Sequence, residues 1–287
     1  MFVLILGGDL RYLEVINHLS INHNVDVVGY KNYFINDKVN NVLIDSVDIS
    51  KYDVIVFPVG GVSENNIIKC RFSSDFKVSD DFLVNSKDNV LIFSGISTPC
   101  LDNILNKAGK SCCYIMKDKE VISKNVVPTV EGIIADIIVN TEKAVNGSSI
   151  TVFGYGNIGS VLVDYLRLLG ANVSVAIVEN SDKLKLDDLG IDCFYSYDTS
   201  SLLSHIGCTD IIINTVPSTI IDDSLIKYIN RDSYVLDISS HPHGISREVL
   251  DTLFIKNKLY LGIPGKVAPI TSGKILTKKI NEVMEGR

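Results

Sequence analysis

Short apolar runs alternate with helical patterns along the whole chain, and this alternation constrains the fold more than any other feature. The runs are almost continuous in Val, Ile, Leu and Phe, which is typical of parallel strands that helices cover on both faces. In the first half we expect helices at about Arg11–Ser20 and Leu101–Lys107. The strands expected there are Phe2–Leu6, Val25–Gly29, Val54–Pro58, Val90–Phe93 and, more weakly, Cys112–Met116.

The same pattern restarts in the second half of the chain. Helices are expected at Ile158–Leu169 and Thr271–Met284. The strands expected there are Ser149–Phe153, Asn172–Val178, Cys193–Tyr195, Ile211–Asn214, Tyr234–Ile238 and Leu259–Leu261. Two rounds of strand and helix predict an α/β protein with two doubly wound domains.

A long helix is expected between the two domains, over residues 128–146. It opens with Pro-Thr-Val-Glu, carries isoleucines at helical spacing and ends at Asn146-Gly147, a typical helix stop. The predicted domains are therefore residues 1–127 and 147–267. The last helix has no strand of its own to cover, so we assign residues 268–287 to the first domain.

The composition argues against several classes of protein. Hydrophobic residues make up 46% of the 287 residues, so the chain can bury a core and is not disordered. It carries 34 acidic and 27 basic residues with no long basic run, which disfavours nucleic acid as a partner. No apolar run approaches the roughly 20 residues of a membrane helix, so no membrane association is expected. The six cysteines lack metal-ligand spacing, so they are interpreted as buried thiols and no metal site is expected.

The most informative motif is a Gly-x-Gly-x-x-Gly fingerprint that directly follows a predicted strand and opens a predicted helix. Gly154 permits the tight turn, Gly156 lets the backbone approach a pyrophosphate, and Gly159 lets the helix pack on the strand. The N-terminus of the helix offers unpaired N–H groups to the phosphates. The cofactor-binding residues expected from this motif are Gly154, Tyr155, Gly156, Asn157, Ile158 and Gly159.

Glu179 lies 20 residues after Gly159, at the end of the next predicted strand. A carboxylate at that position accepts the ribose hydroxyls of NAD and disfavours the 2′-phosphate of NADP. Lys183 and Lys185 follow closely in the sequence and could weaken this preference. A solvated loop acid is the alternative role for Glu179, so the expected cofactor is NAD or NADP.

Polar motifs also stand at the ends of predicted strands, where open α/β sheets bind ligands. The first of them lacks the three-glycine fingerprint, so we interpret it as a turn facing a crevice and not as a second dinucleotide site. A helix cap is the alternative role for Asp9. The motifs are Gly8–Arg11, Phe93–Ser97, Pro128–Gly132, Asn214–Ser218, Asp237–Ser240 and Pro264–Pro269.

Taken together and in this order, these motifs resemble one family, the A subunits of dipicolinate synthase from spore-forming bacteria. The resemblance runs nearly end to end, from Gly7-Gly8-Asp9 to Ala268-Pro269. Its most specific parts are Phe-Ser-Gly-Ile-Ser, Pro-Thr-Val-Glu-Gly and Asn-Thr-Val-Pro-Ser. It implies an N-terminal flavodoxin-like substrate domain and a C-terminal Rossmann NAD(P)-binding domain, similar to formate/glycerate dehydrogenases.

The resemblance also implies a function in sporulation. Together with a flavoprotein-like B subunit, such a chain oxidises dihydrodipicolinate, or its hydroxytetrahydro precursor, to dipicolinate with NAD(P)⁺. The implied location is the cytoplasm of the mother cell. The resemblance leaves open whether the chain also forms a homo-oligomer. Apolar contacts to the partner are expected from strand-end loops around Ile96–Leu101 or Ile220–Leu225.

The implied substrate carries two carboxylates, so cations and hydroxyl or N–H donors are expected around it. Arg11 and Lys266 are the expected cations. The general base stays open among Glu131, His241 and Asp9. The residues expected to bind substrate are Arg11, Ser94, Gly95, Ser97, Thr129 and Lys266, and those expected to add to the cofactor site are Thr215, Val216 and Pro217.

Two positions depart from the family pattern. Val178-Glu179 replaces an Arg that is usual near the end of the second cofactor-domain strand, which leaves a preference for NADP open. His241-Pro242-His243-Gly244 replaces Arg-Pro-Gly-Gly. His241 could bind a carboxylate when protonated, and a neutral loop histidine is the alternative.

Two further functions fit the same scaffold. A 2-hydroxyacid dehydrogenase needs a substrate Arg and a His–Glu pair late in the cofactor domain, but His241, His243 and Arg247-Glu248 stand in the wrong arrangement. A non-catalytic nucleotide-binding subunit that activates a flavoprotein partner is the other alternative. Turnover by the chain alone separates these hypotheses.

Overall fold

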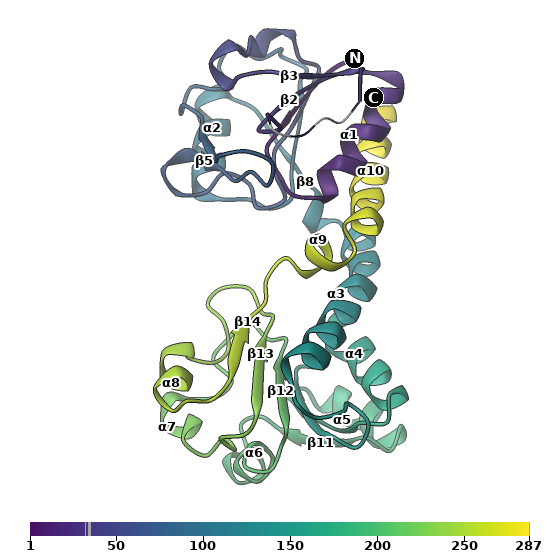
Figure 1. Cartoon of the computed structure of the whole chain (residues 1–287), viewed down its shortest axis with the longest axis vertical. Coiled ribbons are helices and arrows are strands. Elements are labelled where there is room, and N and C mark those ends of the chain that lie inside the picture. Colours follow the sequence, from purple (N-terminus) through teal and green to yellow (C-terminus); the bar gives the residue numbers. More distant parts are fainter. Residues whose placement is uncertain (32, 34–35, 287) are drawn as a thin grey trace. The chain divides into compact units, whose positions relative to one another are not determined.

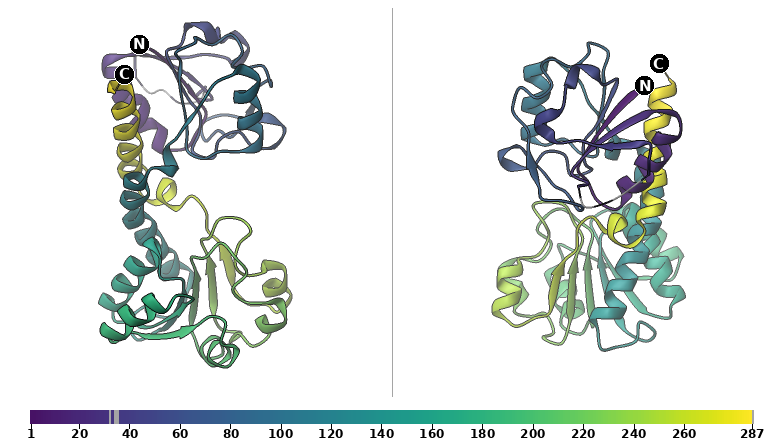
Figure 2. Two further views of the ribbon diagram at one scale, coloured as in Figure 1. Left: turned by 180° about the vertical axis from the view of Figure 1, so that it is seen from behind. Right: turned by 45° about the horizontal axis from the view of Figure 1, so that its top comes forward.

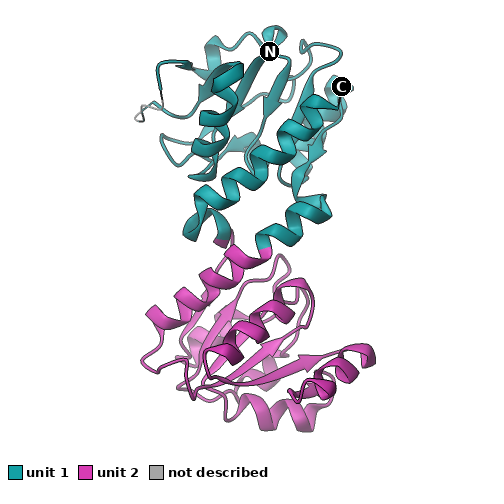
Figure 3. Ribbon diagram, turned by 90° about the vertical axis from the view of Figure 1, so that its right-hand side faces the viewer, with its two compact units in different colours: residues 1–125, 264–287 teal, residues 126–263 magenta. Residues whose placement is uncertain are grey.

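The apolar runs of the sequence form two parallel six-stranded sheets, one in each of two compact units. The computed structural model describes residues 1–31, 33 and 36–286. Unit 1 comprises residues 1–125 and 264–287, and unit 2 comprises residues 126–263 (Figure 3). The predicted α/β class with two doubly wound domains is therefore confirmed.

The sheet of unit 1 has the strand order β3-β2-β1-β4-β7-β8. The five predicted strands alone have the order β2-β1-β4-β7-β8, which is the flavodoxin-like order. The sixth, β3, extends one edge and was not predicted, because Val-Asn-Asn carries a single apolar residue. The strands are β1 (Phe2–Leu6), β2 (Asn24–Val28), β3 (Val39–Asn41), β4 (Val54–Val56), β7 (Leu91–Ser94) and β8 (Cys113–Tyr114).

Helices and short segments complete unit 1. A small antiparallel hairpin pairs β5 with β6, and the described part of the unit also contains four short 3-10 turns. These elements are α1 (Arg11–Asn22), α2 (Pro99–Ala108), α10 (Pro269–Glu285), β5 (Ile67–Ile68), β6 (Phe76–Lys77), η1 (Ile44–Ser46), η2 (Ile49–Lys51), η3 (Glu64–Asn66) and η4 (Ile115–Lys117).

The C-terminal helix α10 packs along α1 in unit 1, as the views in Figures 1 and 2 agree. Leu276 and Ile280 of α10 share a buried cluster with Val15 and Ile16 of α1. Gly273 lets the two backbones approach closely, because a Cβ there would lie 2.6 Å from the carbonyl oxygen of Arg11. The end of the chain thus becomes part of the first sheet's helical cover.

The sheet of unit 2 has the strand order β11-β10-β9-β12-β13-β14, which is the Rossmann order. Its strands are β9 (Ser149–Phe153), β10 (Asn172–Ile177), β11 (Asp192–Tyr195), β12 (Ile211–Asn214), β13 (Tyr234–Asp237) and β14 (Asn257–Leu259). Its helices are α4 (Asn157–Leu168), α5 (Asn180–Asp188), α6 (Thr199–Ile206), α7 (Asp223–Ile226) and α8 (Arg247–Thr252), and α9 (Ile263–Val267) lies at the boundary with unit 1.

The long helix expected over residues 128–146 is α3, and it spans Lys119–Asn140 instead. It starts earlier because the Asp118 carboxylate accepts the N–H groups of Glu120 and Val121. Pro128 therefore lies inside the helix rather than at its first turn. The division between the units falls within α3, so the predicted boundary at 127/128 moves to 125/126 and that at 267/268 moves to 263/264.

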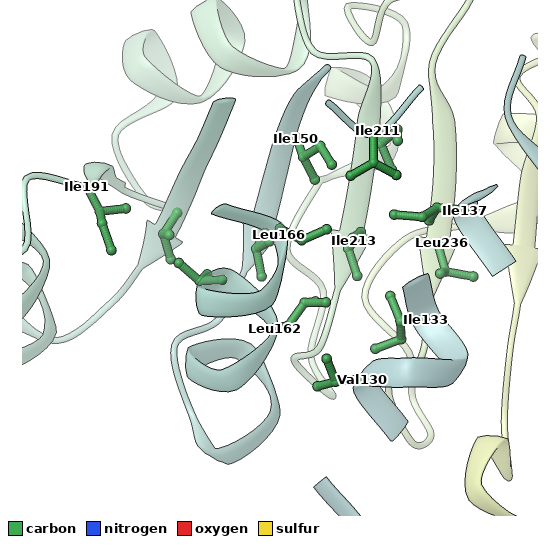
Figure 4. Packing of buried hydrophobic residues seen from close by; sticks show 14 of the residues in the cluster. Val130, Ile133, Ile137, Ile150, Leu162, Leu166, Ile191, Ile211, Ile213 and Leu236 are labelled. Carbon is green, nitrogen blue, oxygen red and sulfur yellow. The ribbon is translucent and has the colours of Figure 1, made fainter. Parts of the chain in front are cut away.

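The core of unit 2 fixes the position of α4, the helix that follows the glycine fingerprint. Val130, Ile133 and Ile137 of α3 pack with Leu162 and Leu166 of α4 against the sheet (Figure 4). All five side chains are fully buried. Among the described residues, no helix is long and apolar enough to span a bilayer, and no group of His, Cys, Asp and Glu side chains could hold a metal ion.

Candidate functional site

The turn between β9 and α4 has the backbone that the fingerprint predicts. Gly154 has φ +95°, and its N–H donates to the carbonyl oxygen of Ala176 at 3.0 Å. A Cβ at Gly154 would lie 2.6 Å from Thr215 Oγ1. A Cβ at Gly159 would lie 2.1 Å from the carbonyl oxygen of Gly154. Neither position has room for a larger side chain, so Gly154 is required for the turn and Gly159 for the contact between helix and strand.

Gly156 differs from its two neighbours in the motif. It is the N-cap residue of α4, and a Cβ there would meet no atom within 4 Å. Nothing in the protein itself requires glycine at this position, because its φ of −81° suits any residue. The open space lies at the N-terminus of α4, where N–H groups and the helix dipole favour an anion. Tyr155 and Ile158 pack against the core beside it.

Glu179 lies two residues after the end of β10, at the same carboxyl edge of the sheet as the glycine turn. It is exposed, at the N-cap position of α5, and its carboxylate caps no N–H of that helix. Two nearby lysines could weaken the preference of Glu179 for NAD over NADP, but both pair with other carboxylates. Lys185 pairs with Asp182 at 3.0 Å, and Lys183 pairs with Asp187 at 3.3 Å.

The loops after β12 and β13 are joined by a buried polar network. Asp237 Oδ1 accepts hydrogen bonds from Asn214 Nδ2 at 3.0 Å and from the N–H of Ser239 at 2.8 Å. Asp237 Oδ2 accepts from the N–H of Gly244 at 2.9 Å. The Asn214 amide in turn accepts from the N–H of Val216. The network holds Val216 against the glycine turn, and the hydroxyl of Thr215 donates to the Phe153 carbonyl at 2.8 Å.

Other predicted site residues of unit 2 lie on different elements. Pro217 is exposed in the loop after β12. His241 is exposed in the loop after β13, and its ring lies 5.7 Å from that of His243, centroid to centroid. Thr129 and Glu131 lie on α3, the first buried and the second exposed.

In unit 1, Asp9 and Arg11 form a forked ion pair. Arg11 donates through Nε at 2.9 Å and through Nη2 at 2.6 Å, and its own backbone N–H also reaches Asp9. The Arg11 side chain is 7% exposed and that of Asp9 40%. Burial disfavours the charge on Arg11, but the hydrogen bond and charge of Asp9 outweigh it and raise the pKa of Arg11. Gly265 lies against this pair, since a Cβ there would stand 2.7 Å from Arg11 Nε.

The predicted hydroxyl donors after β7 have partners within the protein. Ser94 is fully buried and donates to the carbonyl of Ile96 at 2.9 Å. Ser97 is exposed and bonds to Asp102 Oδ2 at 2.6 Å. A Cβ at Gly95 would lie 2.4 Å from the backbone of Val59, so the loops after β4 and β7 are in contact. Lys266 lies exposed on α9.

The glycine turn after β1 is covered by the segment that carries the β5–β6 hairpin. The N–H of Gly8 donates to the Lys69 carbonyl at 2.9 Å, and the N–H of Arg71 donates to the Gly8 carbonyl at 3.0 Å. A Cβ at Gly7 would lie 2.7 Å from the same Lys69 oxygen. Protein backbone thus fills the space that stays open at Gly156 in unit 2.

Three residues close to Ser97 were not predicted from the sequence: Asp102, Tyr114 and Lys117. Asp102 lies on α2, Tyr114 ends β8, and Lys117 lies on η4. Tyr114 donates to Asp102 Oδ1, and Lys117 Nζ lies 4.8 Å from the centroid of the Tyr114 ring. No spacing rule relates Asp102 to Tyr114, because the pairing of β7 with β8 brings them together.

Comparison with known proteins identifies the family. Residues 2–116 match the model of the N-terminal domain of dipicolinate synthase A subunits. The chain is 30% identical over 291 residues to the dipicolinate synthase A subunit of Bacillus subtilis (strain 168), covering 98% of this chain and 95% of that protein. The chain belongs to the family of dipicolinate synthase A subunits. The resemblance seen in the sequence motifs is thereby confirmed.

Solved structures agree with this assignment. The crystal structure of the dipicolinate synthase A subunit from Bacillus halodurans superposes with a TM-score of 0.91 at 27% identity, covering 98% of this chain and 97% of that one. A phosphoglycerate oxidoreductase from Vibrio cholerae O395 shares the fold at a TM-score of 0.56 and 11% identity, covering 100% of both chains. The expected similarity in fold to dehydrogenases of that type is therefore confirmed.

Proposed function

We propose that this chain is the nicotinamide-nucleotide-binding, oxidising subunit of a dipicolinate synthase. The observation that carries the proposal is the glycine turn of unit 2. Gly154 and Gly159 are closed by protein atoms, whereas Gly156 faces open space at the N-terminus of α4. A glycine that the fold does not need is explained when a ligand fills the space beside it.

The substrate of the proposed reaction is dihydrodipicolinate or its hydroxytetrahydro precursor, and the product is dipicolinate. The dihydro ring loses one hydride and one proton, and a hydroxylated precursor also loses water. When bound, the nicotinamide supplies the hydride acceptor. Aromatisation makes the oxidation favourable, so the protein's contribution is to position the ring and to accept a proton.

The nucleotide would lie along the carboxyl edge of the unit 2 sheet. The N–H groups at the start of α4 would hold the pyrophosphate, and the Glu179 carboxylate would accept the ribose hydroxyls. Because Lys183 and Lys185 are paired within α5, the charge of Glu179 would disfavour the 2′-phosphate. We therefore propose NAD as the preferred cofactor.

Substrate binding is proposed for the cations of unit 1 and for α3. Arg11 uses Nε and Nη2 for Asp9, so Nη1 is the group that would face a substrate carboxylate. Lys266 would serve the second carboxylate, and Thr129 would supply a hydroxyl. Glu131 and His241 are exposed and remain proposed proton acceptors. Asp9 is less suited, because both of its oxygens accept hydrogen bonds from Arg11.

The partner proposed for this chain is the flavoprotein-like B subunit of the synthase. The name of the relatives describes one subunit of an enzyme. Glu131 and His241 stand on separate elements, and neither has a partner residue that would complete an acid/base pair among the contacts of the described chain. A second subunit would complete the site or hold the substrate.

The test of the proposed function is Gly156→Val. Because a Cβ at position 156 meets no protein atom within 4 Å, the variant should still fold but lose NAD binding in calorimetry. Gly60→Val is the matched control, since a Cβ there also meets nothing within 4 Å and Gly60 lies in unit 1. Unchanged NAD affinity in Gly156→Val would contradict the proposal. Formation of dipicolinate from freshly made dihydrodipicolinate, followed by its ultraviolet absorption, tests the reaction itself.

A further inference from the structure

A buried carboxylate ends β13 at the edge of the unit 2 sheet where the nucleotide is proposed to bind. Asp237 is the last residue of that strand and is 3% exposed. Its Oδ1 accepts hydrogen bonds from Asn214 Nδ2 at 3.0 Å and from the Oγ of Ser239 at 2.7 Å. Its Oδ2 accepts the N–H of Gly244 at 2.9 Å. The carboxylate therefore ties the end of β12 to the loop that follows β13.

Asn214 connects this carboxylate to the loop after β12. It is fully buried as the last residue of that strand. Its Oδ1 accepts the N–H of Val216 at 2.9 Å, and its Nδ2 also donates to the carbonyl of Val216 at 3.0 Å. A side-chain amide that bonds to both backbone groups of one residue fixes the position of that residue. Val216 in turn borders the glycine turn, because its Cγ2 lies 2.6 Å from the place of a Cβ at Gly154.

Gly244 shows how closely the two loops fit together. A Cβ there would lie 2.2 Å from Asn214 Nδ2. The carbonyl of Gly244 accepts the N–H of Ile220 at 2.9 Å, so the backbone at this position is held by the loop after β12 as well as by Asp237. A side chain at position 244 would therefore push the Asn214 amide away from its partners. The amide can thus be displaced without removing any polar group.

We infer that Asp237 is a positioning residue for the nucleotide and acts through Asn214 on the loop that carries Thr215 and Val216. The inference rests on the proposed function and names residues that set nucleotide affinity from behind the site. Thr215 and Val216 both lie 2.6 Å from the place of a Cβ at Gly154, so they confine the turn that leads to the open space beside Gly156. A turn that is already confined presents its N–H groups to a pyrophosphate without further ordering. When the loop is released, binding must order both segments.

A second buried carboxylate at the other end of β13 provides a matched control. The side chain of Asp136 is 1% exposed and pairs with Lys258 at 2.7 Å. It also accepts a hydrogen bond from the hydroxyl of Tyr234 at 3.2 Å. Tyr234 and Asp237 are the first and last residues of β13, so the two carboxylates lie at opposite edges of one sheet. A general loss of stability would follow from disrupting either network, whereas an effect on the nucleotide is expected from Asp237 alone.

The experiment measures the dissociation constant of NAD by calorimetry, at a temperature at which circular dichroism shows every variant to be folded. Asp237→Ala and Asn214→Ala should each weaken NAD binding about tenfold or more, because each leaves buried polar groups without partners. Two milder variants test the same step. Asp237→Asn loses only the bond from Gly244, and Gly244→Ala displaces Asn214, so each should weaken NAD binding about threefold.

A double-mutant cycle tests whether Asp237 acts through Asn214. Asn214→Asp alone places two carboxylates against each other and should weaken NAD binding about tenfold. Adding Asp237→Asn restores one amide and one carboxylate, and should recover at least about threefold of that loss, as coupled neighbours do. Without nucleotide, the amide hydrogen of Val216 should exchange faster in Asn214→Ala and Asp237→Ala than in the wild-type chain, measured by nuclear magnetic resonance.

The control variant is Asp136→Asn, which should lower the thermal stability but leave the dissociation constant of NAD within about twofold, as expected for a distant site. Wild-type NAD affinity in both Asp237→Ala and Asn214→Ala would overturn the positioning role while the proposed function stands. An equal loss of NAD affinity in Asp136→Asn would also overturn it, because the effect would then be structural. A wild-type chain that binds neither NAD nor NADP would instead overturn the proposed function, and the positioning role with it.

Discussion

At the scale of single residues, Glu179 should determine which nucleotide the chain prefers. Its carboxylate is exposed at the end of β10, and the nearby lysines are paired within α5. Hydrogen bonds to a charged group contribute about 1.5–3 kcal/mol. Glu179→Ala should weaken NAD binding by about that much and improve NADP relative to NAD, measured as dissociation constants by calorimetry.

The control for Glu179 lies on the same helix. Asp188 is an exposed acid at the far end of α5, so Asp188→Ala should leave both nucleotide affinities unchanged. If the wild-type chain binds NADP tenfold better than NAD, Glu179 is not the ribose acceptor.

Arg11 offers a second prediction at this scale. Its forked contact with Asp9 depends on the planar guanidinium, which a lysine cannot reproduce. Arg11→Lys should raise the apparent substrate constant about tenfold or more and leave NAD affinity unchanged. Arg71→Lys, an exposed position in unit 1, is the control. Equal losses for substrate and NAD would show that Arg11 has a structural role instead.

At the scale of elements, the contact between α1 and α10 depends on one glycine. A Cβ at Gly273 would lie 2.6 Å from the Arg11 carbonyl oxygen and 2.6 Å from Glu14 Cβ. Gly273→Val should therefore lower the free energy of unfolding by about 1–3 kcal/mol, the usual cost of overpacking, although valine is the better helix former. Urea unfolding measures the loss.

Lys274→Val provides the comparison for that prediction, because Lys274 is exposed on the same helix. Its free energy of unfolding should change by less than about 0.7 kcal/mol, the range of ordinary helix propensities. Equal effects of the two substitutions would contradict the close packing of α10 on α1.

At the scale of the whole molecule, activity should depend on a second protein. When this chain is mixed with the B subunit, turnover should appear, whereas each protein alone should be inactive. A stable complex should bury more than roughly 1,000 Å² in total. Full turnover by this chain alone would contradict a shared site.

The loops expected to contact the partner differ in what they expose. Leu101 and Ile221 are fully buried, so they cannot serve an interface, because Leu101 anchors α2 and Ile221 packs in the core of unit 2. Ile96 is the first residue of the unit 1 loop that was expected to contact the partner. It is 45% exposed, so its side chain is available to a second protein. Ile96→Asp should therefore reduce co-purification with a tagged B subunit, and Leu43→Asp, at a leucine that is 68% exposed, should not.

Elements with strong local signals could be predicted from the sequence. The strand Phe2–Leu6 and the fingerprint at Gly154–Gly159 follow from apolar runs and from glycines at fixed spacing, which depend on neighbouring residues alone. The order of five strands in unit 1 followed from resemblance to a family. The short edge strand β3 and the start of α3 have weak local signals. Pairing with β2 forms the strand, and capping by Asp118 sets where the helix begins.

Which side chains meet could not be predicted, because their contacts depend on the folded chain. Asp9 and Arg11 form an ion pair with each other. Residues 67–77 cover the first glycine turn, because the chain returns across the edge of the sheet there. Ser97 and Asp102 meet across the start of α2, and the pairing of β7 with β8 brings Tyr114 to the same carboxylate. Side-chain hydrogen bonds act over about 3 Å between residues that no sequence period relates, so a sequence names the candidates and the fold selects their partners.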